Sequence, residues 1–305
     1  MKDSNLKWVY LFTLALLWGS SFILIKKGLV GLSPLQLGSF RTVLAAVFLL
    51  IIGFNKIKHV KKKHWKWIAI SGLLGSFFPT YLFAYAETEI DSAVAAILNS
   101  TVPLIAFILG IFFFNTVFNK KQFIGVSIGL LGSAGLILSG ANLNPDQNYW
   151  FAILPVIAST MYALNANILK TYLEDLPALG IATASFVVIL FPALGVLLYT
   201  GFFNSEFLAQ EEVQTSLLYI SLLAILGTAM AKIIFNRLIQ LSNAVFSTSV
   251  TYLIPVVALG WGIYDGEKFE PIQLIAGFVI LIGVYLANKK KKVKKGKNKL
   301  VEAKQ

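Results

Sequence analysis

Long apolar stretches follow one another along nearly the whole chain, and a short polar segment separates each from the next. About 20 mainly apolar residues are what an α-helix needs to cross the hydrocarbon core of a bilayer. The pattern predicts ten such helices, at residues 8–28, 35–54, 65–86, 91–114, 122–140, 149–169, 178–200, 216–238, 243–264 and 272–288. The short segments between them leave no room for a soluble catalytic domain.

The composition also indicates a protein embedded in a lipid bilayer. Hydrophobic residues make up 57% of the 305 residues and charged residues 13%, whereas soluble domains carry about 25% charged residues. The chain has no cysteine, which excludes disulfides, thiolate metal sites and a cysteine nucleophile. The first residues run directly into a full-length apolar span, so we do not expect a cleaved signal peptide. We predict an all-α integral membrane protein with ten transmembrane helices.

The positive charges gather on one side of the predicted helices. Ten is an even number, so both termini face the same side. If that side is the cytoplasm, the inner segments carry most of the 26 Lys and Arg residues, and the outer segments carry only Lys26, Lys27, Arg41 and Lys268. This distribution follows the positive-inside rule, so we expect a multi-pass protein of the cell (inner or plasma) membrane with both termini cytoplasmic.

The net charge of +12 therefore needs no nucleic acid to explain it. Much of it lies in the tail 289–305, which we expect to be a disordered cytoplasmic anchor for the last helix.

The two halves of the chain resemble each other. "SAVAAILNSTVPLIAFILG" (92–110) corresponds to "NAVFSTSVTYLIPVVALGWG" (243–262), and "QFIGVSIGLLG" (122–132) corresponds to "QLIAGFVILIG" (273–283). We predict a first repeat at 1–140 and a second at 149–288. Five helices per repeat is an odd number, so the second repeat lies inverted in the membrane. Inverted repeats place a substrate site at their interface near the bilayer midplane, which favours a transporter.

Three stretches also resemble a known family: "LLWGSSFILIKKGL" (16–29), "AVAAILNSTVPLIAFILG" (93–110) and "GTAMAKIIFNRLIQLSNAVFSTSVTYLIPVVALGWGIYDGE" (227–267). In this order, and together with Glu267 after the ninth predicted helix, they resemble the EamA-like branch of the drug/metabolite transporter superfamily. The resemblance implies ten helices in two inverted repeats, cytoplasmic termini and movement of small metabolites, often by export. It does not identify a substrate.

Lys232 is the charge that the apolar pattern explains least. Residues 217–231 before it carry no charge, and a lysine near the centre of a membrane helix costs about 2.5–3.5 kcal/mol. One interpretation is that it snorkels to the inner end of its helix near Arg237. Side chains lean toward the N-terminus of a helix, which here points Lys232 to the midplane. We favour a site in which Lys232 binds a substrate carboxylate or phosphate, or carries a proton, with Thr228 and Asn236 on the same face.

Other polar stripes complete the predicted substrate-binding site. Asn99 and Asn165 need partners within the protein, because an amide facing lipid stays unsatisfied. The aromatic candidates are Tyr81, Tyr85, Trp18 and Tyr252, which suit an amphipathic anion or zwitterion such as an amino acid. Serines and threonines in membrane helices often bond their own backbone instead. We interpret Arg41 as an interfacial or structural charge, Glu87 as part of a solvated acidic rim, and Trp67 as a membrane-interface anchor.

These features predict a secondary transporter of small organic metabolites that works by alternating access, with export expected. An integral membrane enzyme is the main alternative, but it would need clustered carboxylates, histidines or metal ligands, and His59 and His64 lie without a partner in a lysine-rich loop. A lipid-binding membrane protein is a further alternative. We expect no catalytic residues, metal or cofactor; the partners are a small-molecule substrate and the bilayer, and homodimerisation is left open.

Overall fold

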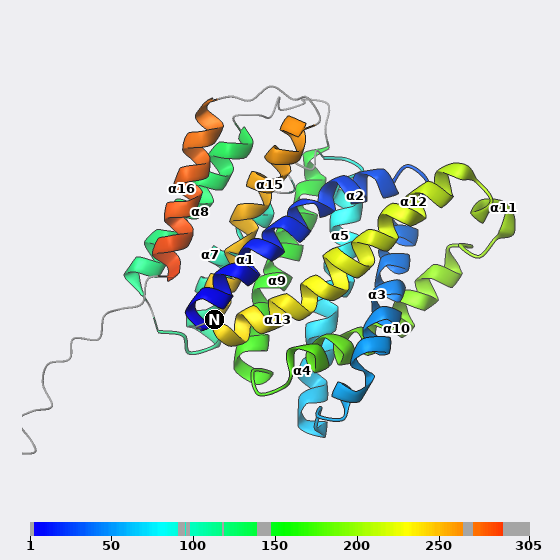
Figure 1. Cartoon of the computed structure of the whole chain (residues 1–305), viewed down its shortest axis with the longest axis horizontal. Helices are drawn as coiled ribbons and strands as arrows, with labels where there is room; N and C mark the ends of the chain where they lie inside the picture. The colour runs from blue at the N-terminus through cyan, green and yellow to red at the C-terminus, as the bar shows by residue number, and fades with distance from the viewer. Residues whose placement is uncertain are drawn as a thin grey trace, which may run out of the picture.

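The computed structural model describes residues 3–90, 95, 98–117, 119–138, 148–264 and 271–288. Within these ranges every regular element is a helix (Figure 1). The tail 289–305, Lys268 and Glu267 lie outside the described residues. The all-helical class predicted from the apolar pattern is therefore confirmed for the part of the chain that is described.

Short helices and breaks subdivide the first half of the chain. Its α-helices are α1 (Asp3–Gly19), α2 (Ser21–Gly28), α3 (Pro34–Ile57), α4 (Trp65–Gly72), α5 (Phe78–Ala86), α7 (Val102–Phe113) and α8 (Lys120–Leu138). A 3₁₀ turn, η1 (Lys62–His64), precedes α4, and a π-helical segment, η2 (Leu73–Phe77), joins α4 to α5. The start of α3 follows from its sequence: Ser33 and Gln36 form a reciprocal capping box around Pro34 at the first helical position.

The second half repeats this layout. Its helices are η3 (Tyr149–Ala152), α9 (Ile153–Tyr172), α10 (Ala178–Tyr199), α11 (Ser205–Leu208), α12 (Glu211–Leu222), η4 (Leu223–Met230), α13 (Ala231–Leu241), α14 (Ala244–Thr248), α15 (Val250–Tyr264) and α16 (Pro271–Asn288). Like η2, η4 is a π-helical segment in the middle of a long span. Such segments carry an extra residue per turn and often mark functional sites.

Several of these helices suit a membrane. Among the described residues, six helical segments are long and apolar enough to cross a bilayer: Asn5–Gly28, Pro34–Ile57, Lys62–Ala86, Trp150–Tyr172, Ala178–Tyr199 and Glu211–Leu241. Shorter apolar helices lie at Val102–Phe113, Ala244–Val257 and Ile275–Ala287. Large apolar side chains also cover the outside; Phe112, for example, is 77% exposed. The protein is therefore a multi-pass membrane protein, and the count of ten helices stays a prediction.

Equivalent helices of the two predicted repeats pack against each other. α8 lies along α16 at one end of the molecule, and α3 lies along α10 at the other (Figure 1). Between them Ser100 donates a long hydrogen bond, 3.5 Å, to the carbonyl oxygen of Thr251, its counterpart in the repeat alignment. Contacts between counterparts are expected where a pseudo-two-fold axis passes between repeats.

One seam closes the basic end of the molecule, by which we mean the end that carries the lysine-rich segment 56–66. There α4 and α9 run antiparallel. The Ser71 hydroxyl donates to Asn165 Oδ1 at 2.6 Å, and the Trp67 and Tyr172 rings stack with centroids 3.8 Å apart. At the surface His64 Nε2 lies 3.4 Å from Asp175 Oδ2, so His64 has the partner that the sequence interpretation denied it. We call these three pairs the inner closure.

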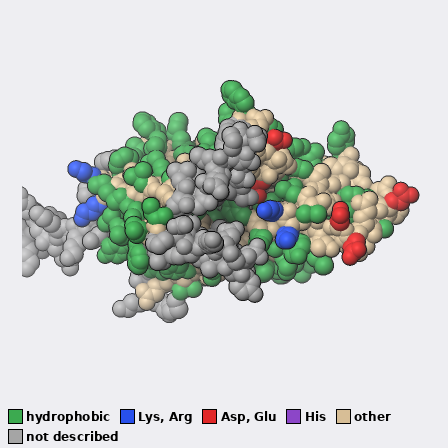
Figure 2. Space-filling view, turned by 90° about the horizontal axis from the view of Figure 1, so that it is seen from above, with side chains coloured by type: hydrophobic (Ala, Val, Ile, Leu, Met, Phe, Trp, Pro, Cys, Tyr) green, Lys and Arg blue, Asp and Glu red, His purple; other side chains and the backbone are tan. Residues whose placement is uncertain are grey.

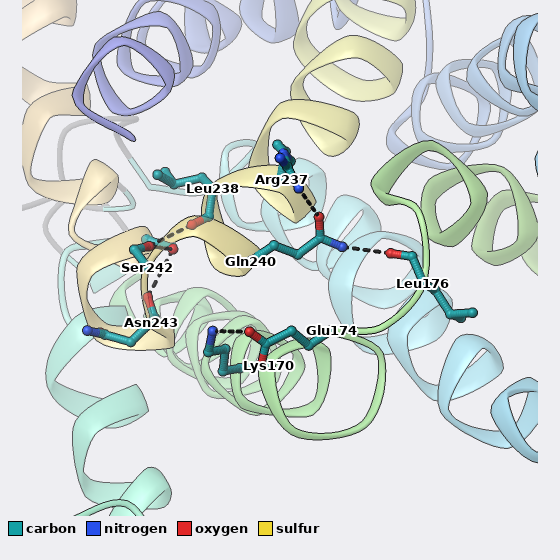
Figure 3. A network of polar contacts seen from close by, with 9 residues as sticks. Lys170, Glu174, Leu176, Arg237, Leu238, Gln240, Ser242 and Asn243 are labelled. Carbon is teal, nitrogen blue, oxygen red and sulfur yellow. Dashed lines mark hydrogen bonds and ion pairs between the residues drawn. The ribbon is translucent and has the colours of Figure 1, made fainter. Parts of the chain in front are cut away.

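The segment that follows α9 is held to α13 at the same end. The Gln240 side-chain amide donates to the Leu176 carbonyl oxygen at 2.7 Å, and Arg237 donates to Gln240 at 3.2 Å (Figure 3). One turn earlier, Asn236 Nδ2 donates to the Ala178 carbonyl oxygen at 3.3 Å. Helix α13 is therefore hydrogen-bonded to residues 176 and 178, which follow α9 at the basic end.

Glycines allow the close packing of α8 on α16. A Cβ built on Gly283 would lie 2.6 Å from the Gly129 Cα, so valine at 283 forces the two helices apart. Overpacking of this kind typically costs about 1–3 kcal/mol. We expect Gly283→Val to lower the Tm of the purified protein in detergent.

Gly277→Val on the same helix is the matched control, because a Cβ there meets nothing within 4 Å. Equal Tm values for the two variants would contradict this packing.

Candidate functional site

A central cavity is built by both halves of the chain. Its empty volume, including the part open to solvent, is about 1020 Å³. The first half supplies walls from α1, α2, α3, η2, α5 and the start of α7, and the second from α9, η4, α13, α14 and α15. Seen from above the view of Figure 1, the molecule has a hollow near its middle, with Lys or Arg side chains beside it (Figure 2).

Lys232 lies in the wall of this cavity and is 6% exposed. Its Nζ donates to the carbonyl oxygen of Gly75 at 3.0 Å, across from the second half of the chain to the first. Gly75 lies in the π-helical segment η2, where the wider turn leaves backbone carbonyls available to other donors. Lys232 thus faces the cavity and does not snorkel to the end of its helix.

Asn165 presents its amide nitrogen at the same place. Its Oδ1 accepts the hydrogen bond from Ser71, which orients Nδ2 the other way. A Cβ built on Gly75 would overlap the Asn165 amide and lie 2.6 Å from Lys232 Nζ. An ammonium group and an amide N–H₂ group therefore converge on one point of the cavity wall, and each has donors left to offer.

Arg41 also lines the cavity, a place that its interpretation as an interfacial or structural charge did not include. Its Nε donates to Thr228 Oγ1 at 2.6 Å and so joins α3 to η4 across the two halves. Glu87 and Tyr162 line the same cavity and act electrostatically on Arg41. Glu87 is thus part of the cavity wall and not merely of an outer rim. The sequence interpretation missed these three as site residues.

The remaining cavity walls combine aromatic, aliphatic and small hydroxyl side chains. Trp18 lines the cavity, and its Nε1 donates to the Gly227 carbonyl oxygen in η4 at 3.0 Å. Its ring packs against Phe235, with centroids 5.3 Å apart. Phe83 and Phe22 also line the cavity. These rings offer apolar surface to a ligand whose polar end meets the donors described above.

Five of the nine predicted site residues line the cavity, namely Lys232, Thr228, Asn99, Asn165 and Trp18, and the other four do not. Asn236 lies one turn after Lys232 on α13, and its side-chain amide donates to the carbonyl oxygen of Ala178. The Tyr81 hydroxyl pairs with Ser39 at 2.9 Å, and Tyr85 is exposed on the outside. Tyr252 is buried against α8, where its hydroxyl donates to the Val126 carbonyl oxygen at 2.8 Å.

The model of the EamA-like transporter family matches residues 6–138 and 149–289 of this chain, one match for each predicted repeat. The uncharacterized inner membrane transporter YedA of Escherichia coli K12 is 28% identical over 283 residues, covering 90% of this chain and 88% of YedA. A probable terminal-alkyne amino-acid exporter of Streptantibioticus cattleyicolor is 24% identical over 292 residues, 95% of each chain.

One solved crystal structure superposes with a TM-score of 0.72 at 16% identity, covering 93% of this chain and 96% of the other. At that identity the likeness shows the fold alone. The names of the two relatives are those of transporters and not of enzymes, which sets the enzyme alternative aside. The family model covers both halves of the molecule that build the cavity, and the chain belongs to the EamA-like transporter family.

Proposed function

We propose that this protein is a secondary transporter that moves small organic metabolites bearing a carboxylate, amino acids among them, by alternating access, with export as its direction. The observation that carries the proposal is the convergence of Lys232 Nζ and Asn165 Nδ2 on one point of a cavity built by both halves. An ammonium and an amide side by side match the two oxygens of a carboxylate, and hydrogen bonds to charged groups are the strong ones.

The name of the Streptantibioticus relative, a probable amino-acid exporter, makes amino acids the first compounds to test. The aromatic wall formed by Trp18, Phe83 and Phe235 favours those with apolar side chains.

Ten transmembrane helices in two inverted repeats, 1–140 and 149–288, complete the proposal. Each predicted span overlaps a described helix, and equivalent helices such as α8 and α16 pack together. The concentration of lysine at the basic end supports a cytoplasmic location for that end and for both termini. α1 begins and α16 ends toward the same side of the molecule, as this topology requires (Figure 1).

The inner closure supports alternating access. It lies beside the cavity at the basic end: Ser71–Asn165 and Trp67–Tyr172 join α4 of the first repeat to α9 of the second, and His64–Asp175 joins η1 to the segment after α9. Asn165 belongs both to this seam and to the proposed carboxylate site. Entry of substrate from the cytoplasm requires the seam to part, so substrate contact and closure share one residue.

Flux in proteoliposomes tests the proposal. Vesicles preloaded with an unlabelled amino acid should accumulate the same labelled compound by counterflow, and this uptake should saturate. An imposed pH gradient that drives uptake identifies proton coupling, and no effect of the gradient identifies facilitated exchange. A protein that binds lipids without transport gives no counterflow for any carboxylate compound, and that result would overturn the proposal.

A further inference from the structure

Most hydroxyl groups in the cavity wall donate their proton to a backbone carbonyl oxygen of their own helical segment. Thr248 donates to the carbonyl oxygen of Ala244 at 2.8 Å, and Thr251 donates to that of Thr248 at 3.0 Å. Ser21, Ser76 and Thr228 donate likewise to Leu17, Gly75 and Leu223. These hydroxyl groups have no proton left to donate to a ligand, although their oxygens can still accept hydrogen bonds. Lys232, Asn165 and Arg41 supply the donors.

Asn99 is different, because its side-chain amide oxygen is an acceptor that has no donor in the described part of the chain. It lines the cavity, is 7% exposed, and its Oδ1 is buried with no hydrogen-bond partner among the residues that the structure describes. A buried amide oxygen left without a donor carries an uncompensated desolvation penalty. That cost is recovered when a ligand brings an N–H or O–H group to this oxygen.

We propose that Asn99 is a specificity-determining residue, whose Oδ1 accepts a hydrogen bond from an amino or hydroxyl group of the carboxylate substrate. The proposal rests on the proposed function, since Lys232 and Asn165 hold the carboxylate. It narrows the substrate class to carboxylates that also carry a hydrogen-bond donor, as amino acids and hydroxy acids do. A plain carboxylic acid of the same size would leave Oδ1 unpaired and is rejected.

An acceptor at position 99 should disfavour plain carboxylic acids more strongly than it favours donor-bearing ones. A site built to hydrogen-bond a substrate group discriminates strongly against the analogue that lacks it, because the protein group stays desolvated and unpaired. An apolar side chain at position 99 removes the unpaired oxygen along with the bond. Such a variant should lose affinity for the donor-bearing substrate and lose none for the plain acid.

Three compounds that differ in one group test the proposal: phenylalanine, phenyllactate and phenylpropanoate. Their shared ring suits the aromatic walls. Affinity for each is measured by calorimetry on the purified protein and by competition against labelled phenylalanine in counterflow. In the wild type we expect phenylalanine and phenyllactate to bind at least about 10-fold more tightly than phenylpropanoate, which corresponds to about 1.4 kcal/mol. In Asn99→Leu we expect the three affinities to become equal within about threefold.

Asn99→Asp keeps an acceptor and adds a charge, so it serves if the leucine variant does not fold. It should favour the ammonium of phenylalanine over the hydroxyl of phenyllactate more strongly than the wild type does. If the wild type binds all three compounds equally, or if Asn99→Leu keeps the wild-type preference, Asn99 does not select the substrate and the proposed function still stands. If the wild type binds none of them, the proposal for Asn99 is overturned, and the proposed function is overturned as well if no carboxylate compound gives counterflow.

Discussion

Replacing Lys232 with methionine is expected to abolish most transport of a carboxylate substrate. The substitution removes the ammonium that faces the cavity and leaves a side chain of similar length. A hydrogen bond to a charged group is worth about 1.5–3 kcal/mol, so we expect affinity to fall about 10- to 150-fold. Folding should be unaffected or improved, because burying an ammonium in a membrane helix is itself costly.

Counterflow by wild type and variant, with equal amounts of protein that elutes as a single species, measures this effect. Arg237→Gln is the matched control: Arg237 is a cation on the same helix, but it lies at the surface and bonds only Gln240 among the pairs described. It should transport as the wild type does. A Lys232→Met variant with unchanged KM and rate would show that the carboxylate is held elsewhere in the cavity.

The fold and Lys232 were predictable because both follow from the cost of polar groups in lipid. Every predicted span overlaps a described helix, since no other arrangement satisfies the backbone within a bilayer. The same cost identifies Lys232, because a charge that follows fifteen uncharged residues needs polar surroundings inside the protein. Asn165 and Asn99 were predictable on the same ground, and both line the cavity.

The remaining candidates depended on helix rotation and depth, which a single sequence does not specify. Tyr81 lies at the position equivalent to Lys232 in the other repeat, and both residues follow a π-helical segment, yet Tyr81 does not line the cavity. Its hydroxyl turns to Ser39 on α3. Asn236 shares the face of Lys232 and lies one turn below the cavity, where it bonds the segment after α9.

Long-range contacts explain the other differences. Arg41 was interpreted from its place near the end of a span, yet it bonds Thr228, which lies 187 residues away in the sequence. Trp67 was interpreted as an interface anchor, but it stacks on Tyr172 with the ring planes 2° apart. No local pattern encodes either pairing, since each partner lies in the other repeat.

The second large expected effect concerns the Trp67–Tyr172 stack. We expect the inner closure to open more often when this stack is lost. Aromatic pairs contribute about 0.5–1.5 kcal/mol beyond the area they bury, so Trp67→Ala should shift the balance toward the open seam about 2- to 12-fold. The chain has no cysteine, so Ser71→Cys supplies a single reporter at a position that is fully buried in the closed seam. A membrane-impermeant thiol reagent is added from the basic end. It should label the Ser71→Cys protein faster by that factor when the protein also carries Trp67→Ala.

The comparison is made within the Ser71→Cys background, so the lost Ser71–Asn165 hydrogen bond is common to both proteins. Trp150→Ala is the matched control, because Trp150 is 84% exposed and lies outside the seam. Saturating substrate should change the labelling rate as well, since Asn165 lies both in the seam and beside Lys232. Labelling that is equally slow in all three proteins would show that α4 and α9 stay together throughout the cycle. The pathway to the cytoplasm would then have to open between other helices, with the three pairs serving as a fixed hinge instead of a moving closure.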